Sequence, residues 1–387
     1  MDKAKRKILW QFLFVAVNIA VVVIIATVDF GGETATVPFS EAWALIRKNW
    51  YFFAGAIALT FVSILLDVVK YTIMIRSATK RTRPKTAYNC SQLGRYYDNV
   101  TPFGSGSQPF VIHYLTQKRI DGGQAMAIVI TTFILQQLAF TFLGPYFLIN
   151  YSLSGSGNPL FPLFVALSWT GYVIFLFIPL MLVLITVKPA IAARIADFFV
   201  RLFTKMKIVK NPEKVSLRIR NSLDRYKQTA AYLAKNPLRV IVVFVISMLQ
   251  AAIYFGIPYF VCRSLGASAA ETVDLFSRMM MIYFAITIIP TPGGSVAAEF
   301  SFLSVFAEIL KGYVFWGILL WRLLVFYLYL VQGLIIIIAR AIKYSRRKPV
   351  PLLLPAETAP MPQAPVAEAA AELVPETEPE TELTTEN

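Results

Sequence analysis

The sequence has few of the side chains on which most catalytic sites depend. Its 387 residues include one histidine, His113, and two cysteines, Cys90 and Cys262. Metal catalysis through histidines therefore has no candidates. The cysteines have neither metal nor redox spacing, so we interpret both as small core residues. A lone histidine more often has a structural role, in which it is hydrogen-bonded, than a role as a proton relay, so we interpret His113 as structural. We also expect that the protein binds no cofactor.

Charged residues are also scarce, at 15% of the chain, whereas 57% of it is hydrophobic and the mean hydropathy is +0.61. This balance excludes a single soluble globular domain and is typical of an all-α, polytopic integral membrane protein. There are 37 basic residues, and eight of the 22 acidic ones are glutamates after residue 350. The basic residues form short runs beside apolar segments, where they set topology and attract anionic headgroups rather than nucleic acid.

The apolar segments predict about six membrane spans, since roughly 20 helical residues cross the hydrocarbon core. The expected spans are residues 8–28, 50–76, 123–151, 160–187, 237–265 and 314–344. The first is interpreted as a signal anchor because it is longer than the apolar region of a cleaved signal peptide. Basic runs adjoin the ends that the positive-inside bias assigns to the cytoplasm, and both termini are expected there.

Two further apolar segments are interrupted by proline and glycine. Residues 101–110 read TPFGSGSQPF and residues 291–300 read TPGGSVAAEF, with identity at five of the ten positions. Such backbone leaves polar groups that hydrocarbon cannot satisfy, so it must lie inside protein or line a wet cavity. The neighbouring charges predict a re-entrant hairpin over residues 88–115 that enters from the cytoplasm, and a second over residues 275–310 that enters from outside.

The order span, span, hairpin, span occurs twice with opposite orientation, which predicts an inverted repeat of the kind found in transporters. The predicted parts are residues 1–187 for the first repeat, 188–236 for a basic cytosolic connector, 237–345 for the second repeat and 346–387 for a disordered acidic tail rich in Pro, Ala and Glu. Within the connector, residues 191–206 have the pattern of an amphipathic helix on the inner membrane surface.

Several charged residues fall inside the expected membrane region. Asp67 and Lys70 are three residues apart on one helical face, and we interpret them as a structural ion pair, with a proton or substrate role as the alternative. Glu299 follows the second break, and Arg322 in the last span is its expected partner. That pair either neutralises itself or binds a ligand. Arg278 adds a further fixed positive charge.

A helix that begins just after a glycine-rich break presents free N–H groups to an anionic oxygen such as a lipid phosphate. The candidate substrate-binding residues are therefore those of the two breaks with the nearby charges: Asn99, Thr101, Pro102, Gly104, Ser105, Gln108, Arg278, Thr291, Pro292, Gly293, Gly294, Ser295, Glu299 and Arg322. Neither a nucleophile paired with a base nor a P-loop is visible, since GSGS at residues 104–107 lacks the required lysine.

These motifs resemble a known family, the lysylphosphatidylglycerol synthase transmembrane region, also described as flippase-like integral membrane proteins. The resemblance rests on NVTPFGSGSQP at residues 99–109, on PTPGGSVAAE at residues 290–299, which is similar to the family pattern PxPGGxGxxE, and on Trp321 with Arg322. It departs from the pattern where Ser295 and Val296 replace a common glycine. Multiple peptide resistance factors in this family carry a soluble aminoacyltransferase domain after the membrane part, whereas an acidic tail follows here.

The resemblance implies a flippase-like protein of a bacterial plasma membrane that binds or translocates a phospholipid or a lipid-linked anionic substrate. The alternative is an enzyme, either a phosphatidylglycerol lysyltransferase that uses lysyl-tRNA or the membrane subunit of a separate transferase. A purely structural scaffold is a third interpretation, and the polar broken helices argue against it.

Overall fold

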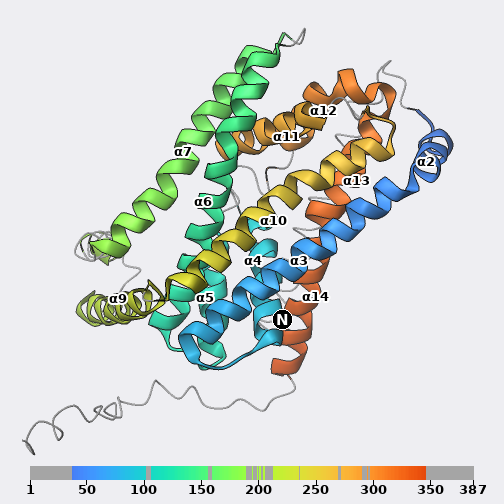
Figure 1. Cartoon of the computed structure of the whole chain (residues 1–387). Coiled ribbons are helices and arrows are strands. Elements are labelled where there is room, and N and C mark those ends of the chain that lie inside the picture. Colours follow the sequence, from blue (N-terminus) through green and yellow to red (C-terminus); the bar gives the residue numbers. More distant parts are fainter. Residues whose placement is uncertain are drawn as a thin grey trace, which may run out of the picture. The chain divides into compact units, whose positions relative to one another are not determined.

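The computed structural model describes residues 37–101, 106–155, 159–188, 194, 198, 200–201, 204, 212–234, 236–268, 272–289, 294 and 297–345. Every regular element among them is a helix, which confirms the predicted all-α class (Figure 1). The helices are α2 (Phe39–Lys48), α3 (Trp50–Thr79), α4 (Pro84–Val100), α5 (Ser107–Gln117), α6 (Gly122–Ser154), α7 (Phe161–Val187), α9 (Pro212–Ala234), α10 (Pro237–Ser264), α11 (Thr272–Thr287), α12 (Ala297–Leu310), a 3₁₀ turn (Lys311–Tyr313), α13 (Val314–Arg322), the π-helical segment η3 (Leu323–Tyr327) and α14 (Leu328–Ser345).

Among the residues that the structure describes, five helical stretches are long and apolar enough to cross a membrane, which confirms a polytopic membrane protein. They are Trp50–Thr79, Gly122–Ser154, Phe161–Leu184, Pro237–Ser264 and Ala297–Arg340. These match five of the predicted spans, the last of them continuous with the second arm of the second hairpin. The remaining predicted span, residues 8–28, lies outside the described residues. The chain forms two compact units, residues 1–341 and 342–387, and the arrangement below is that of the first.

The helices α3 and α10, which the predicted repeat makes equivalent, pack against each other in antiparallel orientation (Figure 1). At one end the Asn49 side chain donates to the carbonyl of Ser264 at 3.4 Å, and at the other Arg239 donates to the Ser77 hydroxyl at 3.5 Å. The start of each helix therefore lies beside the end of the other. An inverted repeat requires this relation between its equivalent helices.

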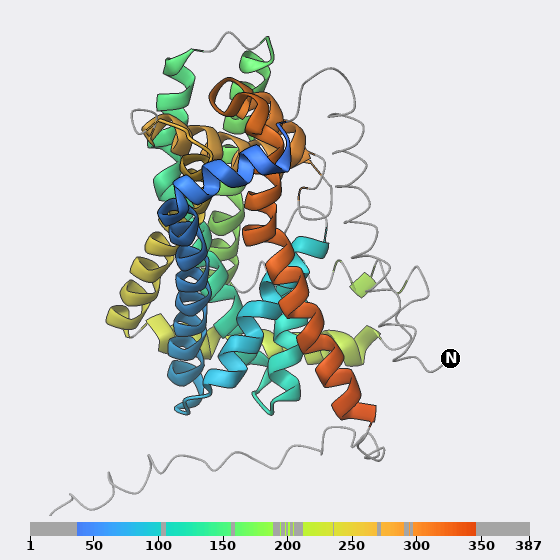
Figure 2. The same ribbon diagram turned by 90° about the vertical axis from the view of Figure 1, so that its right-hand side faces the viewer.

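The two interrupted segments form helical hairpins whose bases lie at opposite ends of the α3–α10 pair (Figures 1 and 2). The hairpin α4–α5 begins after the end of α3, and Arg83 closes its base by donating to the carbonyl of Lys118 at 2.9 Å. The hairpin α11–α12 begins after the end of α10, and that end of α10 lies beside the start of α3. The predicted opposition of the hairpins thus follows from the antiparallel pair.

Glycine allows the second hairpin to approach the fourth span. A Cβ built on Gly171 of α7 would lie 2.0 Å from the carbonyl oxygen of Phe284 in α11. A backbone carbonyl cannot move aside as a flexible side chain can, so only glycine at position 171 allows α7 and α11 to pack this closely. The packing of α7 on α11 then covers one side of the membrane unit, where Tyr172 stands edge-on to the ring of Phe284 at 5.3 Å.

We expect Gly171→Ala to destabilise the protein by about 3 kcal/mol, because the two backbones must separate to admit the methyl group. Thermal unfolding of the purified protein in detergent, followed by circular dichroism, measures the change. Gly122→Ala is the matched control, since a Cβ there meets nothing within 4 Å. Equal melting temperatures for the two variants would contradict the proposed close packing.

The connector between the repeats is described mainly through α9, which packs on α6. Arg225 lies 3.4 Å from the Asp121 carboxylate, whose other oxygen caps α6 by accepting from the amide of Gly123 at 2.8 Å. Most of the segment predicted to lie on the membrane surface, residues 191–206, is outside the described residues, as is the tail after residue 345. Both cysteines are free and fully buried, which confirms their interpretation as core residues.

A labelling experiment tests the opposed hairpins directly. Lys80 and Lys311 are exposed residues at the two ends of the membrane unit, and Gly312 next to Lys311 accepts from the amide of Val37 ahead of α2. Single Lys80→Cys and Lys311→Cys variants should react with a membrane-impermeant maleimide from opposite sides, in intact cells and in inverted vesicles. The native cysteines are buried and should remain silent. Labelling of both positions from one side would refute the arrangement.

Candidate functional site

Described residues at or beside both hairpin breaks line one cavity, which has a volume of about 240 Å³. Asn99, Ser107 and Gln108 line it beside the first break, and Ile289 and Gly294 line it beside the second. Its remaining walls come from α3, α6, α7, α10 and α11. The hairpins come from the two predicted repeats, and transporters built as inverted repeats bind their substrates at the interface between the repeats.

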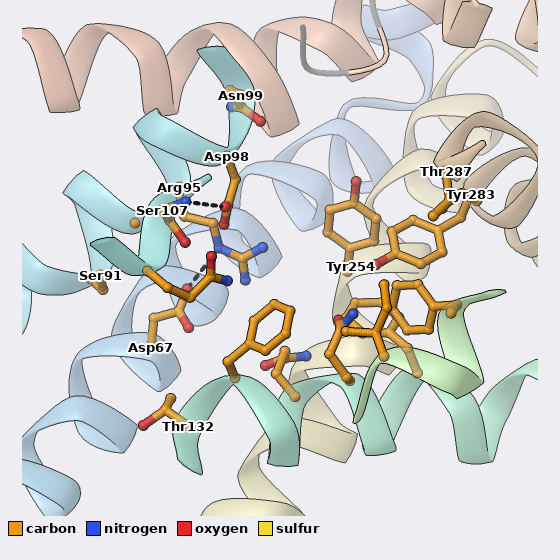
Figure 3. A pocket seen from close by; sticks show the side chains of 18 of the residues that line it. Asp67, Ser91, Arg95, Asp98, Asn99, Ser107, Thr132, Tyr254, Tyr283 and Thr287 are labelled. Carbon is orange, nitrogen blue, oxygen red and sulfur yellow. Dashed lines mark hydrogen bonds and ion pairs between the residues drawn. The ribbon is translucent and has the colours of Figure 1, made fainter. Parts of the chain in front are cut away.

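The cavity has a charged side and an aromatic side. Figure 3 shows the side chains of Asp67, Arg95 and Asp98 on one side and those of Tyr254 and Tyr283 on the other. Charged residues within a membrane protein are costly unless they face a polar interior, so their gathering at one cavity marks it as the candidate functional site.

An ion cluster joins α3 to the first hairpin. The Asp67 carboxylate contacts two cations, with Lys70 Nζ 3.0 Å from Oδ1 and Arg95 Nε 3.0 Å from Oδ2. Lys70 also donates to the side-chain oxygens of Gln136 in α6 and Gln250 in α10. The Lys70 side chain is 1% exposed and that of Asp67 is 8% exposed, whereas Arg95 remains 25% exposed. The predicted Asp67–Lys70 pair is thus present, and it forms part of a larger cluster.

The start of α5 is capped by side chains from the preceding break. Thr101 Oγ1 accepts from the amide of Gly106 at 3.0 Å, and Asp98 Oδ1 accepts from the amide of Ser107 at 3.2 Å. These are two of the amides that a helix N-terminus leaves without an intrahelical partner. In this conformation both amides are occupied by the protein itself, whereas the Arg95 guanidinium lines the same cavity with a positive charge that attracts an anion.

Four rings form the aromatic side of the cavity. Phe140 stacks on Tyr283 with centroids 4.8 Å apart, and it stands edge-on to Phe175 at 6.1 Å and to Tyr254 at 5.9 Å. Each ring comes from a different helix, α6, α11, α7 or α10. Edge-to-face contacts of this kind fix the positions of the rings, so the four rings form a well-packed apolar wall of the cavity.

The second break is held by a buried ion pair behind the cavity. Arg322 Nε lies 2.5 Å from Glu299 Oε1, with side-chain exposures of 6% and 2%, and Arg322 also donates to the carbonyl of Gly294 at 3.5 Å. Gly294 has a φ of +66°, which other residues rarely adopt. The guanidinium also lies 5.0 Å from the ring centres of Trp321 and Phe326. This pair fixes the turn from which α12 begins.

A π-helical segment links the last membrane helix to the first hairpin. Asn99, at the tip of that hairpin, donates to the carbonyl of Phe326 in η3 at 3.4 Å. The same helix supplies Arg322 to the second hairpin, immediately before η3. Insertions of this kind occur often at functional sites. One helix therefore contacts the breaks of both hairpins.

The predicted site residues divide into three groups. Asn99, Gln108 and Gly294 line the cavity, and Thr101 caps the adjacent helix. Arg278 lies elsewhere, with Nε 2.6 Å from Asp274 and Nη1 2.5 Å from the carbonyl of Val305, so it joins α11 to α12. The predicted residues that lie outside the described part of the chain are Pro102, Gly104, Ser105, Thr291, Pro292, Gly293 and Ser295. The predicted role of these seven residues in binding a substrate remains a prediction, as does that of Glu299 and Arg322.

The sequence interpretation did not single out Arg95 and Asp98. Both belong to RYYD, the four residues at positions 95–98 just before the first break. The available signal was a pair of opposite charges directly beside a glycine-rich interruption. The partner of Arg95, Asp67, is 28 residues away in the chain, and its contact becomes visible only when α4 folds back along α3.

Fold and cavity together define a class, the polytopic helical membrane proteins with a charged internal site between opposed re-entrant hairpins. The chain belongs to the family described as the lysylphosphatidylglycerol synthase TM region, whose profile matches residues 8–333. It is also similar to a UPF0104 membrane protein from Archaeoglobus fulgidus, with 23% identity over 291 residues that cover 74% of this chain and 85% of that protein. The family expected from the motifs is thus confirmed.

The Glu299–Arg322 pair yields a stability prediction. Glu299→Gln should lower the free energy of unfolding by about 3 kcal/mol because it removes the carboxylate that neutralises a buried guanidinium. Adding Arg322→Gln should cost less than about 1 kcal/mol more, since the pair acts as a unit. Chemical unfolding in detergent measures both changes.

Glu308→Gln is the matched control for this experiment. Glu308 lies on the same helix, is 52% exposed and lies 3.8 Å from Arg278. Its loss should change the stability by no more than about 0.5 kcal/mol, as exposed pairs contribute little. A similar loss for Glu299→Gln and Glu308→Gln would contradict a structural role for the buried pair.

Proposed function

We propose that this protein binds the anionic headgroup of a phospholipid, or of a lipid-linked substrate, in the cavity and moves it between the two faces of the membrane. The observation that carries the proposal is that described residues at or beside both hairpin breaks line one cavity, which also holds the partly exposed guanidinium of Arg95. Sites between opposed broken helices, supplied with a charged ligand group, are characteristic of secondary transporters.

The size of the cavity supports a headgroup as the bound part. Pockets for drug-sized molecules begin at roughly 300 Å³, and this cavity holds about 240 Å³. It therefore suits a small polar group rather than a whole lipid. The acyl chains of a lipid have no need of a protein pocket, because hydrocarbon already solvates them. A headgroup crossing the membrane does need one, since its charge is costly in hydrocarbon.

The chemistry of the two sides supports an amphiphilic substrate. Arg95 offers a planar set of donors suited to phosphate oxygens, and Asn99 and Gln108 offer amides next to it. The opposite wall of Phe140, Tyr254 and Tyr283 suits the less polar backbone of a lipid. In the cavity Asp67 pairs with both Lys70 and Arg95, and Asp98 accepts from Ser107, so binding an anion through Arg95 must rearrange this cluster.

The proposal predicts that filling the cavity stops lipid movement. In vesicles with the reconstituted protein, tail-labelled fluorescent phosphatidylglycerol should cross to the outer leaflet, where dithionite bleaches it. Thr287→Trp places a large side chain at the cavity wall and should slow the bleaching of the inner-leaflet pool at least about tenfold.

Thr170→Trp is the control, because Thr170 is exposed on α7 while both threonine hydroxyls bond the carbonyl four residues earlier. It should move lipid at the normal rate. Movement that is equal in all proteins, or absent with the unmodified protein, would overturn the proposal. Comparison of cellular lipids with and without the gene tests the transferase alternative, which requires the loss of an aminoacylated lipid.

A further inference from the structure

We propose that Arg95 is an exchangeable cation: it pairs with Asp67 when the cavity is empty and leaves Asp67 to bind the substrate's anionic phosphate, while Lys70 keeps Asp67 neutralised. This inference rests on the proposed function and assigns the residue that recognises the headgroup. It also explains why one carboxylate in the membrane has two cationic partners.

Asp67 can release one of its two cations without becoming an uncompensated buried charge. Removing one partner of a buried ion pair normally leaves the other charge uncompensated, which strongly opposes the change. Asp67 avoids this cost because its two cations contact different oxygens, each at 3.0 Å. When Arg95 leaves Oδ2, Lys70 still neutralises the carboxylate through Oδ1.

Of the two cations, Arg95 is the one that is free to move. Lys70 is almost completely buried and donates to Gln136 and Gln250, so three helices hold it in place. Arg95 is 25% exposed toward the cavity, and its contact with Asp67 uses Nε alone. Its two terminal nitrogens, which that contact does not use, are the pair that binds phosphate oxygens in bidentate fashion.

The contact between Arg95 and Asp67 joins the first hairpin to α3. Asp67 and Lys70 lie on the uninterrupted helix α3, whereas Arg95 lies on α4, six residues before the break that starts at Thr101. Asp98, on the same arm, is held by the amide of Ser107. An anion that draws Arg95 from Asp67 therefore releases one tie between the first hairpin and α3. Binding thus favours conformations in which that hairpin has shifted.

The test compares two variants with the unmodified protein, all purified in uncharged detergent. Arg95→Gln removes the exchangeable cation, and the double variant Asp67→Asn/Lys70→Gln removes its counter-ion. The summed formal charge of Asp67, Lys70 and Arg95 is +1, and the double variant keeps it at +1 because it removes one charge of each sign. Any change in affinity therefore reports the loss of competition by Asp67 rather than a change in net charge.

Binding is measured by calorimetry with dihexanoyl phosphatidylglycerol as the probe, and separately with inorganic phosphate. We expect Arg95→Gln to weaken binding of the lipid more than about tenfold, and the double variant to strengthen it about tenfold. Parallel changes with inorganic phosphate would place the recognition in the phosphate group alone. Changes confined to the lipid probe would support a headgroup site. Both results support the exchange.

Unchanged binding by Arg95→Gln, or binding by the double variant that is equal to or weaker than normal, would overturn the inference. If the double variant does not fold, the Arg95→Lys variant provides the test. It keeps the ion pair with Asp67 but cannot bind a phosphate in bidentate fashion. The affinity for the lipid probe should therefore fall severalfold while the melting temperature stays unchanged. An unmodified protein that neither binds nor moves anionic lipid defeats the proposed function itself. Normal lipid movement by Arg95→Gln defeats this inference alone.

Discussion

Backbone amides and carbonyls at a membrane interior must find partners within the protein, and this requirement governs both hairpins. Each break interrupts a helix where lipid offers no hydrogen bonds. The first break meets the requirement with side chains from its own neighbourhood, Thr101 and Asp98. The second uses a distant side chain, Arg322, which reaches the carbonyl of Gly294 while pairing with Glu299. Of these groups, Asp98 also lines the cavity, so the solution at the first break contributes to its charged side.

The antiparallel pair of α3 and α10 provides the frame on which the hairpins are mounted. Near its middle, Gln250 donates to the carbonyl of Ser63 at 3.1 Å and accepts from Lys70. Polar contacts inside a membrane protein fix the relative position of helices more firmly than apolar packing alone. The ion cluster at Asp67 is thereby anchored to both repeats, and Arg95 brings the first hairpin into the same cluster.

Much of this architecture can be inferred from the sequence because the bilayer simplifies the possibilities. Apolar stretches of sufficient length must span, and a proline–glycine interruption such as that after Ile289 must be sheltered. The i, i+3 spacing of Asp67 and Lys70 already indicates their contact. Pairing across the structure is harder to infer: Arg278 resembles a ligand group until Asp274 and Val305 lie beside it. Arg95 has an opposite charge, Asp98, three residues later on its own helix, and nothing in the sequence indicates that its ion pair is with Asp67 on α3.

Because η3 is a π-helical turn, the final membrane helix packs against its neighbours through differently directed faces before and after this segment. An α-helix advances about 100° per residue, so one additional residue in a turn rotates everything after it by about that angle. Before η3, Trp321 stacks on Phe302 of α12 with centroids 5.1 Å apart. After it, Gly333 lies so close to Tyr96 of α4 that a Cβ would be 2.3 Å away. The final membrane helix therefore packs one face against α12 of the second hairpin and a differently directed face against α4 of the first, so that a single helix contacts both hairpins.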